Sequence, residues 1–201
     1  MSSIKIRGRR RALIRLSVVL AAPALLGVRG VLAASAADRD KAAAILAHIG
    51  EASCIAEGRG RRTVHVFFDP NCPYCHHLYT ALRPHVAAGG IRVCWIPLGF
   101  LTASSLPKAA AMLQAPDPFK AFQRNEEDYD FAANGQPGGG LEPAAAVTAR
   151  TRAALARNLA LYNGQKLFGV PVMVWKRAEG ADMLIGVPGE ARLRDILASV
   201  R

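Results

Sequence analysis

The segment Thr63-Val64-His65-Val66-Phe67-Phe68-Asp69-Pro70-Asn71-Cys72-Pro73-Tyr74-Cys75 decides the fold. Its first six residues are mostly β-branched or aromatic, which predicts a strand over 63–68, and the Asp-Pro-Asn triplet ends that strand. Residues 73–88 have a helical composition and stop at two glycines, after which a second strand is predicted over 91–96. Strand, Cys-x-x-Cys, helix and strand therefore form a βαβ unit, with both cysteines at the first turn from strand to helix.

The position of the two cysteines at the start of a helix has a chemical consequence. The free N–H groups and the partial positive charge of a helix N-terminus stabilise a thiolate at Cys72. A lower pKa gives Cys72 more attacking thiolate at neutral pH and makes it a better leaving group. Cys75 lies one helical turn further along, within reach of a mixed disulfide at Cys72. We therefore predict that Cys72 is the nucleophile and Cys75 the resolving thiol of a redox-active Cys72–Cys75 pair.

Two other interpretations of these cysteines stay open. A Cys-x-x-Cys can be half of a zinc site, and His76 and His77 follow directly. Adjacent helical side chains point about 100° apart, however, and no second Cys-x-x-Cys or spaced histidine pair follows, so we predict no metal site and no cofactor. We expect both histidines to be exposed helix residues, and the alternative is that one of them tunes the charge around Cys72. A purely structural Cys72–Cys75 disulfide is the second alternative, and the position at a strand-to-helix turn argues against it.

The chain after residue 104 is first mostly helical and then returns to strands. Helices are predicted over 109–113, 118–129 and 143–162, with a glycine-rich break at 134–140. Strands follow over 172–175 and 181–186, and a final helix over 190–200. Residues 38–50 form a further predicted helix near the start. The expected fold class is α/β, with a βαβ half and a ββα half separated by a helical insertion at about 104–165.

Several segments carry a resemblance to a known family. The segment Phe68-Asp69-Pro70-Asn71-Cys72-Pro73-Tyr74-Cys75 resembles the active-site segment of the periplasmic disulfide isomerase and chaperone family of DsbC and DsbG, especially its DsbG branch. Residues 95–98, 105–113, 169–171 and 186–188 resemble later segments of the same family. The resemblance covers roughly residues 55–200. It implies a thioredoxin-like catalytic domain over 61–201, preceded by a short helix and linker over 37–60.

The resemblance also implies a substrate site. From the residues alone, a proline that heads a strand, as Pro171 does, can be cis or trans. Gly169-Val170-Pro171 resembles the cis-proline loop of the family, which implies that Pro171 is cis and faces Cys72 and Cys75. Val170 would then offer backbone groups to an extended substrate, with Tyr74 as a further substrate-binding residue. The isomerase branch commonly has Thr where Val170 stands, and Val at this position resembles the oxidase branch of DsbA.

Cys54 and Cys94 are the two remaining cysteines. In a thioredoxin fold an N-terminal strand often pairs beside the strand that follows the active-site helix, which would bring Cys54 close to Cys94. We hypothesise that these two form a structural disulfide outside the active centre. The alternative is a pair of buried free thiols, which are ordinary core residues.

The net charge of +11 is concentrated at the N-terminus, where the first 36 residues hold seven basic residues and no acidic one. Residues 16–28 are apolar, a run too short for a membrane span and typical of an export signal. We predict a signal peptide over 1–36, cleaved after Ala36 or nearby, and an uncleaved N-terminal anchor is the alternative. Arg10-Arg11 resembles a twin-arginine signal, with the general secretory route as the alternative. Both interpretations place the folded part in the periplasm, an oxidising compartment in which cysteine pairs indicate disulfide chemistry.

These observations lead to two hypotheses from different classes. The first is an exported thiol–disulfide oxidoreductase, either a reductase or isomerase or an oxidase, that acts on periplasmic proteins and is reset by a membrane redox partner. The second is a non-catalytic periplasmic chaperone or binding module with a thioredoxin fold. Residues 37–60 are too few for the N-terminal dimerisation domain of the family's isomerases, so we expect a monomer. Outside the N-terminus no basic stripe is interleaved with aromatic residues, which argues against nucleic-acid binding.

Overall fold

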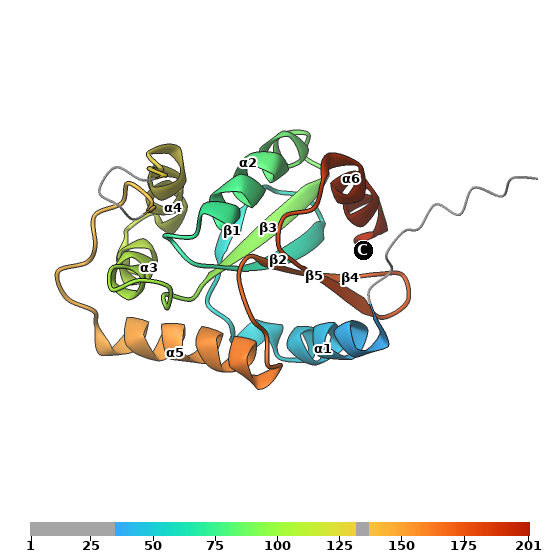
Figure 1. Ribbon diagram of the computed structural model, residues 1–201, viewed down its shortest axis with the longest axis horizontal. Helices are drawn as coiled ribbons and strands as arrows, with labels where there is room; N and C mark the ends of the chain where they lie inside the picture. The colour runs from blue at the N-terminus through green and yellow to red at the C-terminus, as the bar shows by residue number, and fades with distance from the viewer. Residues whose placement is uncertain (1–34, 132–136) are drawn as a thin grey trace, which may run out of the picture. The chain divides into compact units, whose positions relative to one another are not determined.

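A mixed sheet of five strands organises the fold (Figure 1). The computed structural model describes residues 35–131 and 137–201. Its strands are β1 (Ile55–Glu57), β2 (Arg62–Phe68), β3 (Ile91–Pro97), β4 (Val172–Lys176) and β5 (Ala181–Ile185), in the order β1-β3-β2-β4-β5. β2 and β3 are parallel, and the other neighbouring pairs are antiparallel. β2 is therefore the central strand, and the chain leaves its carboxyl end directly into the segment that holds Cys72.

Helices cover both faces of this sheet (Figure 1). The helices α1 (Ala36–Ala47) and α5 (Ala149–Gly164) lie on one face, and α2 (Pro73–Ala87) and α6 (Glu190–Ser199) lie on the other. The helices α3 (Ser105–Gln114) and α4 (Pro118–Glu127) follow β3, and a short 3-10 turn, Ile49–Glu51, follows α1. Within residues 35–131 and 137–201, no helix has the length and apolar character needed to cross a membrane.

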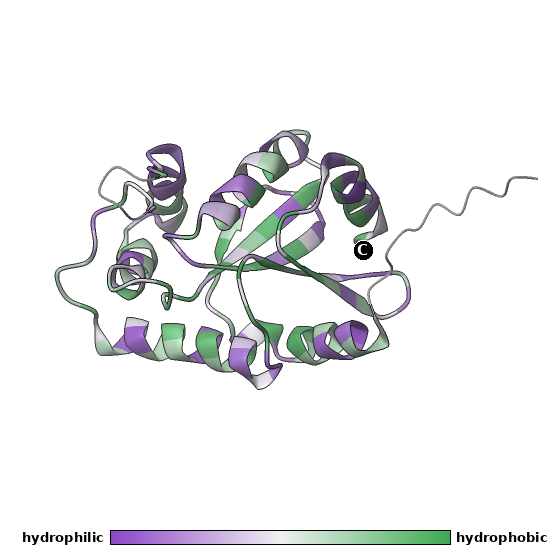
Figure 2. Cartoon of the chain, in the orientation of Figure 1, coloured by the Kyte–Doolittle hydropathy of each residue, from purple (hydrophilic) through white to green (hydrophobic). Residues whose placement is uncertain are grey.

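Aromatic side chains join the layers. Phe67 of β2 contacts Tyr162 of α5 edge-on at 6.0 Å between ring centroids. The next residue, Phe68, points to the opposite face of the sheet, where it packs 5.3 Å from Phe122 of α4. Phe122 also lies 5.0 Å from Trp95 of β3. Figure 2 shows apolar residues concentrated along the central strands. The insertion is thus fixed, through Phe122, against the βαβ unit that carries the two cysteines.

The α/β fold class with a helical insertion is confirmed, because β2-α2-β3 and β4-β5-α6 form the two halves and α3 to α5 lie between them. The largest boundary difference concerns the last helix of the insertion, predicted from residue 143 and observed from Ala149. Thr148 is the reason, because its side-chain oxygen accepts a hydrogen bond from the backbone N–H of Thr151 and so caps the helix.

The structure does not separate residues 37–60 from the rest of the fold. The described residues from Ser35 onward form one unit, in which β1 is a strand of the sheet and α1 packs against β4 and β5. Of the predicted signal peptide over 1–36, residues 1–34 lie outside the described residues, and Ser35 is the N-cap of α1.

Candidate active site

Cys72 occupies the N-cap position of α2. Its backbone is extended, and its sulfur accepts a hydrogen bond of 3.3 Å from the backbone N–H of Cys75. Pro73 fits the first helical position, where a residue without an N–H costs nothing. The sequence therefore places a sulfur atom where helices usually have a hydroxyl or carboxylate cap, against N–H groups that favour its negatively charged form.

The two thiols of this motif differ in acidity. Both are free and buried, with 3% of Cys72 and 2% of Cys75 exposed. A hydrogen bond from the Cys75 thiol lowers the pKa of Cys72, and the backbone N–H groups of Cys75 and Tyr74 act in the same direction, against burial. Burial raises the pKa of Cys75 well above its ordinary value, and the hydrogen bond that it shares with Cys72 raises it further. This asymmetry favours Cys72 as the attacking thiolate and Cys75 as a thiol that stays protonated at rest.

A second loop approaches Cys72 from the other half of the fold. The Val170–Pro171 peptide bond is cis, and the carbonyl oxygen of Val170 lies 3.5 Å from the sulfur of Cys72. Two hydrogen bonds hold this loop, from the Tyr162 hydroxyl to the carbonyl of Gly169 at 2.9 Å and from the N–H of Gly186 to the carbonyl of Pro171 at 2.8 Å. The structure thus brings Cys72, Cys75, Val170 and Pro171 together.

A buried carboxylate, Asp69, braces the turn between β2 and α2. One of its oxygens accepts hydrogen bonds from the Asn71 N–H at 3.0 Å and the Ser105 hydroxyl at 2.7 Å. The other accepts from the N–H groups of Phe100 at 2.8 Å and Leu101 at 3.1 Å. Sequence reasoning treated Asp69 only as the end of a strand, so this bracing role was missed. The available signal was the occurrence of both Asp69 and Ser105 in segments that carry the family resemblance.

Asn71 extends the network into the helical insertion. Its side-chain nitrogen lies 2.7 Å from the Thr102 hydroxyl and 2.9 Å from that of Ser104, and its side-chain oxygen accepts a 3.1 Å hydrogen bond from Lys108. Lys108 also donates to the carbonyl of Gly139. The turn that carries Cys72 is therefore held from several sides by the insertion, a contribution that the sequence alone does not reveal.

His76 differs from the sequence expectation. It was expected to be exposed, yet only 18% of its side chain is accessible, and its Nδ1 lies 3.2 Å from a carboxylate oxygen of the buried Glu126. The ring stacks on Tyr129 at 4.6 Å. Because the side chain of Glu126 comes from α4, this pairing depends on the tertiary placement of the insertion. His77 is exposed as expected and stacks on Phe131 at 5.3 Å.

Large apolar side chains are exposed around the cysteines. Tyr74, inside the motif, is 63% exposed, and Phe168, two residues before Val170, is 76% exposed. The remaining large apolar residues that are exposed in the described part of the chain lie on segments that contact Asp69, His77 or Pro171: Phe100, Leu101, Phe131 and Val187. Exposed apolar side chains that gather in one place mark an interaction surface more often than scattered ones do.

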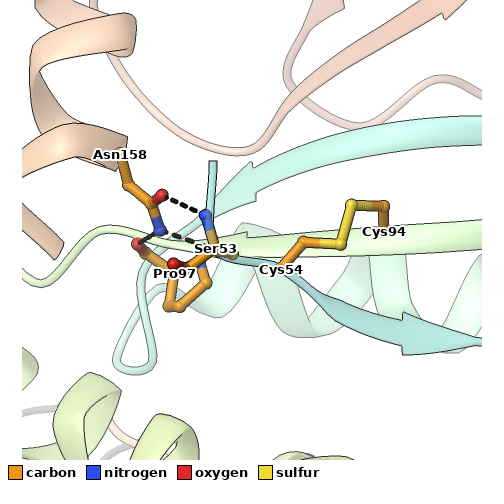
Figure 3. The surroundings of a disulfide bond; sticks show 5 residues. All are labelled: Ser53, Cys54, Cys94, Pro97 and Asn158. Carbon is orange, nitrogen blue, oxygen red and sulfur yellow. Dashed lines mark hydrogen bonds between the residues drawn. A yellow bond between two sulfur atoms is a disulfide. The ribbon is translucent and has the colours of Figure 1, made fainter. Parts of the chain in front are cut away.

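Cys54 and Cys94 are joined by a disulfide bond, with 5.5 Å between their Cα atoms. Cys94 lies on β3, and Cys54 directly precedes β1, which pairs with β3. Beside the disulfide, the side chain of Asn158 from α5 bonds both backbone groups of Ser53 and the carbonyl of Pro97, at 2.8–2.9 Å (Figure 3). The disulfide therefore belongs to a tightly held junction of β1, β3 and α5.

The described residues offer no ligand set for the zinc alternative, because no group of three or more His, Cys, Asp or Glu side chains among them could hold a metal ion. His76, which the zinc alternative would use as a ligand beside the two cysteines, instead contacts Glu126 and the rings of Tyr129 and Phe131.

The comparison with known proteins agrees with this geometry. Residues 50–201 match the thioredoxin-like domain family. The thiol:disulfide interchange protein DsbG of Pseudomonas aeruginosa is 33% identical over 150 residues, which cover 73% of this chain and 56% of the relative. DsbG of Escherichia coli is 38% identical over 63 residues, or 31% of this chain and 25% of the relative.

A solved structure shows the same fold. The catalytic domain of Proteus mirabilis ScsC matches with a TM-score of 0.60 and 20% identity, over 80% of this chain and 96% of that one. The chain spans about half the length of the Pseudomonas aeruginosa relative and a quarter of the Escherichia coli one. It belongs to the thioredoxin-like family and is a homologue of the thiol:disulfide interchange protein DsbG.

Proposed function

We propose that the chain is an exported thiol–disulfide oxidoreductase that exchanges disulfides with other proteins through Cys72 and Cys75. The observation that carries the proposal is the pair of unequal thiols at the start of α2, with the pKa of Cys72 lowered through hydrogen bonding and the pKa of Cys75 raised by burial. A structural disulfide needs no such difference in acidity, whereas stepwise exchange needs one thiol that attacks and a second that waits.

The proposed reaction has two steps. The Cys72 thiolate attacks a substrate disulfide, so that a mixed disulfide forms and one substrate sulfur leaves as a thiolate. Cys75 then loses its proton and attacks the Cys72 sulfur, which releases the second substrate sulfur and leaves a Cys72–Cys75 disulfide. In the oxidising direction the same steps run backwards from a substrate dithiol. The carbonyl of Val170, 3.5 Å from the Cys72 sulfur, lies where an extended substrate would align its backbone.

The substrates that suit this surface are unfolded or misfolded proteins. Tyr74, Phe131 and Phe168 would contact apolar residues beside the substrate cysteine, and such residues are exposed only while a protein is not fully folded. The Cys54–Cys94 disulfide and the predicted export signal both support a periplasmic location. We further propose a membrane redox partner that resets Cys72 and Cys75, and a monomeric state.

The reduction potential of the Cys72–Cys75 pair decides the direction of electron flow. A reduction potential of about −120 mV would make the protein an oxidant of the DsbA type. A potential of about −200 mV or below would make it a reductase or isomerase. Equilibration of the purified protein with glutathione, followed by a mass-shift readout of thiol alkylation, measures this value.

The central test compares two serine variants on a model protein with a disulfide. We expect Cys72→Ser to abolish disulfide reduction, and Cys75→Ser to accumulate a mixed disulfide between Cys72 and the substrate. Full activity of Cys72→Ser overturns the assignment. The chaperone alternative gains support if the native protein shows no exchange while the Cys72→Ser/Cys75→Ser double variant still suppresses aggregation of an unfolded protein.

A further inference from the structure

One long segment of the chain carries basic residues and no acidic ones. Residues 143–178 contain six Lys or Arg and no Asp or Glu, whereas residues 37–142 and 179–201 together contain thirteen basic and fifteen acidic residues. The segment comprises α5, the loop that follows it and β4. The excess positive charge of residues 37–201 is therefore concentrated in this segment, which favours a partner with negative charge.

Four of the six basic side chains lie on α5 or directly after it and are exposed; we call them the basic surface: Arg150, Arg152, Arg157 and Lys166. Across the part of the chain that the structure describes, none of the four forms a salt bridge. Basic side chains elsewhere in that part do form them, as Arg177 does with Asp182 at 3.2 Å. Unpaired charges of one sign on one element attract charges of the opposite sign.

The basic surface ends beside the active site. Tyr162, in the last turn of α5, donates a 2.9 Å hydrogen bond to the carbonyl of Gly169. The carbonyl of the next residue, Val170, lies 3.5 Å from the Cys72 sulfur. Lys166 lies four residues before Val170, so at most about 14 Å separates their Cα atoms. A lysine at this position is within reach of a polypeptide that is aligned along Val170.

The backbone of Lys166 gives a reason to look for a function of its side chain. Its φ is 51°, in the left-handed region, and its N–H donates a 2.8 Å hydrogen bond to the carbonyl of Asn163 at the end of α5. Glycine is favoured at such helix ends because a side chain strains a left-handed backbone. The helix dipole offsets part of this cost by favouring a cation. Residues held in such conformations are frequent at functional sites.

The other side of the Cys72 motif is acidic. Tyr129, which follows α4, donates a 2.9 Å hydrogen bond to the carbonyl of Asn71, the residue before Cys72. Glu127 and Asp128, directly before Tyr129, are exposed. The end of α4 and the loop before β4 lie on different sides of the start of α2 (Figure 1). A substrate bound at Cys72 therefore has positive charge on one side and negative charge on the other.

We propose that the basic surface binds acidic side chains of the protein that exchanges disulfides at Cys72, and that Lys166 contacts those nearest to the reacting cysteine. The proposal rests on the proposed function and specifies its substrate, a polypeptide with Asp or Glu on the side of its cysteine that faces the loop before β4. The attraction acts on the first, bimolecular step. In that step the Cys72 thiolate bonds to one substrate sulfur, and the other sulfur leaves with the electron pair of the broken bond.

The test uses the reduced full chain and short peptides whose single cysteine is disulfide-bonded to 2-nitro-5-thiobenzoate. Cys72 attacks the peptide sulfur and the coloured thiobenzoate leaves, so its release measures the first step. One peptide has glutamates only before the cysteine, a second has them only after it, and a third has glutamines at all these positions. The leaving group is the same in all three, so the rates report the flanking charges and their position.

We expect one of the two glutamate peptides to react on the order of tenfold faster than the glutamine peptide at low ionic strength, and the other to gain little. This preference should vanish at about 1 M salt, where charges are screened beyond about 3 Å. Lys166→Glu should remove the preference, and Lys166→Arg should keep it. Lys176→Glu makes the same charge change in the same acid-free segment but at the far end of β4, so it is the matched control and should leave the preference unchanged.

Lys166→Gly separates substrate binding from a role in ending α5. If the side chain binds substrate, this variant loses the preference for the glutamate peptide while its urea midpoint rises, because glycine relieves the left-handed backbone. If Lys166 only ends the helix, the urea midpoint changes and the preference stays as in the native chain. The second result overturns the part that Lys166 has in the proposal.

Two further outcomes would overturn the proposal as a whole. Equal acceleration of both glutamate peptides would show a general attraction by the net positive charge. Equal rates for all three peptides, with stronger sedimentation of the native chain than of Arg157→Glu/Lys166→Glu with phosphatidylglycerol vesicles, would assign the basic surface to a membrane instead. Each of these results leaves the exchange chemistry standing, whereas thiobenzoate release by Cys72→Ser at the native rate would overturn the proposed function itself.

Discussion

The hydroxyl of Ser105 donates a 2.7 Å hydrogen bond to the carboxylate of Asp69, which is 1% exposed. The two residues are 36 positions apart, and their contact joins the first turn of the helical insertion to the turn that presents Cys72. The same carboxylate also accepts from the N–H groups of Asn71, Phe100 and Leu101. Asp69 therefore accepts hydrogen bonds both from the turn that presents Cys72 and from the segment that leads from β3 into α3.

Asp69→Ala should destabilise the fold strongly, because it leaves several donors without an acceptor. Each buried donor without a partner costs about 1–3 kcal/mol, so we expect a loss of about 3 kcal/mol or more in the free energy of unfolding. Urea unfolding measures it. Asp117→Ala, which removes the exposed N-cap of α4, is the matched control and should cost about 1 kcal/mol. Equal losses in both variants would contradict the bracing role of Asp69.

Alkylation of Cys72 by iodoacetamide should reach half its maximal rate at a pH below the ordinary cysteine value of about 8.5, because its pKa is lowered in the folded protein. The first cause is the hydrogen bond from the Cys75 thiol, so Cys75→Ala should move the profile to higher pH. The rate is followed by mass spectrometry across a pH series. An identical profile in Cys75→Ala would show that the helix N-terminus alone sets the acidity of Cys72.

The stability of the reduced protein should have a maximum near the ordinary cysteine pKa. The lowered pKa of Cys72 contributes stability that is present above the unfolded pKa and lost as pH falls through the folded value. The raised pKa of Cys75 contributes stability that is present below the unfolded pKa and lost as pH rises towards its folded value. Urea midpoints of the reduced protein across pH measure this, and the Cys72→Ser/Cys75→Ser variant should not show the maximum.

Removal of the Cys54–Cys94 disulfide should lower stability without abolishing exchange. The bond closes a loop with a sequence separation of 40, and the loss of such a bond typically costs about 2–4 kcal/mol. We expect the Cys54→Ser/Cys94→Ser variant to unfold at lower urea concentration and to keep its disulfide-exchange activity on a model protein. Alkylation of both cysteines in the untreated, non-reduced protein, detected by mass mapping, would contradict a stable disulfide.

The βαβ core could be predicted from sequence because its signals are local. The strand over 63–68 and the helix that begins at Pro73 follow from β-branched residues, the Asp-Pro-Asn stop and the proline at the first helical position. The strand β1 has three residues, too few for a pattern of its own. It is defined by its pairing with β3, which residue composition does not encode.

The active site could be predicted only in part, because some of its contacts join residues that are far apart in the sequence. Cys72 and Cys75 are neighbours in sequence, and Pro171 was placed by resemblance. The pairs Asp69–Ser105 and His76–Glu126 are separated by 36 and 50 residues. Their partners come from α3 and α4, and nothing in a single sequence specifies how these helices turn towards α2. A histidine on a helix surface is therefore expected to be exposed until the insertion is seen to cover it.

Phe168 should contribute to the binding of unfolded proteins but not to the chemistry. It is 76% exposed and lies two residues before Val170, whose carbonyl is 3.5 Å from the Cys72 sulfur. Partial burial of a phenylalanine against a substrate is worth about 1.4 kcal/mol, or a tenfold change in affinity. We expect Phe168→Ser to raise KM for a reduced or scrambled protein about tenfold and to leave the rate at which the reduced protein reduces 5,5′-dithiobis(2-nitrobenzoate), a small disulfide, unchanged. Phe168→Leu keeps the apolar contact and should restore most of the affinity. If Phe168→Ser binds the protein substrate as tightly as the native chain, the exposed apolar surface is not the substrate-binding face.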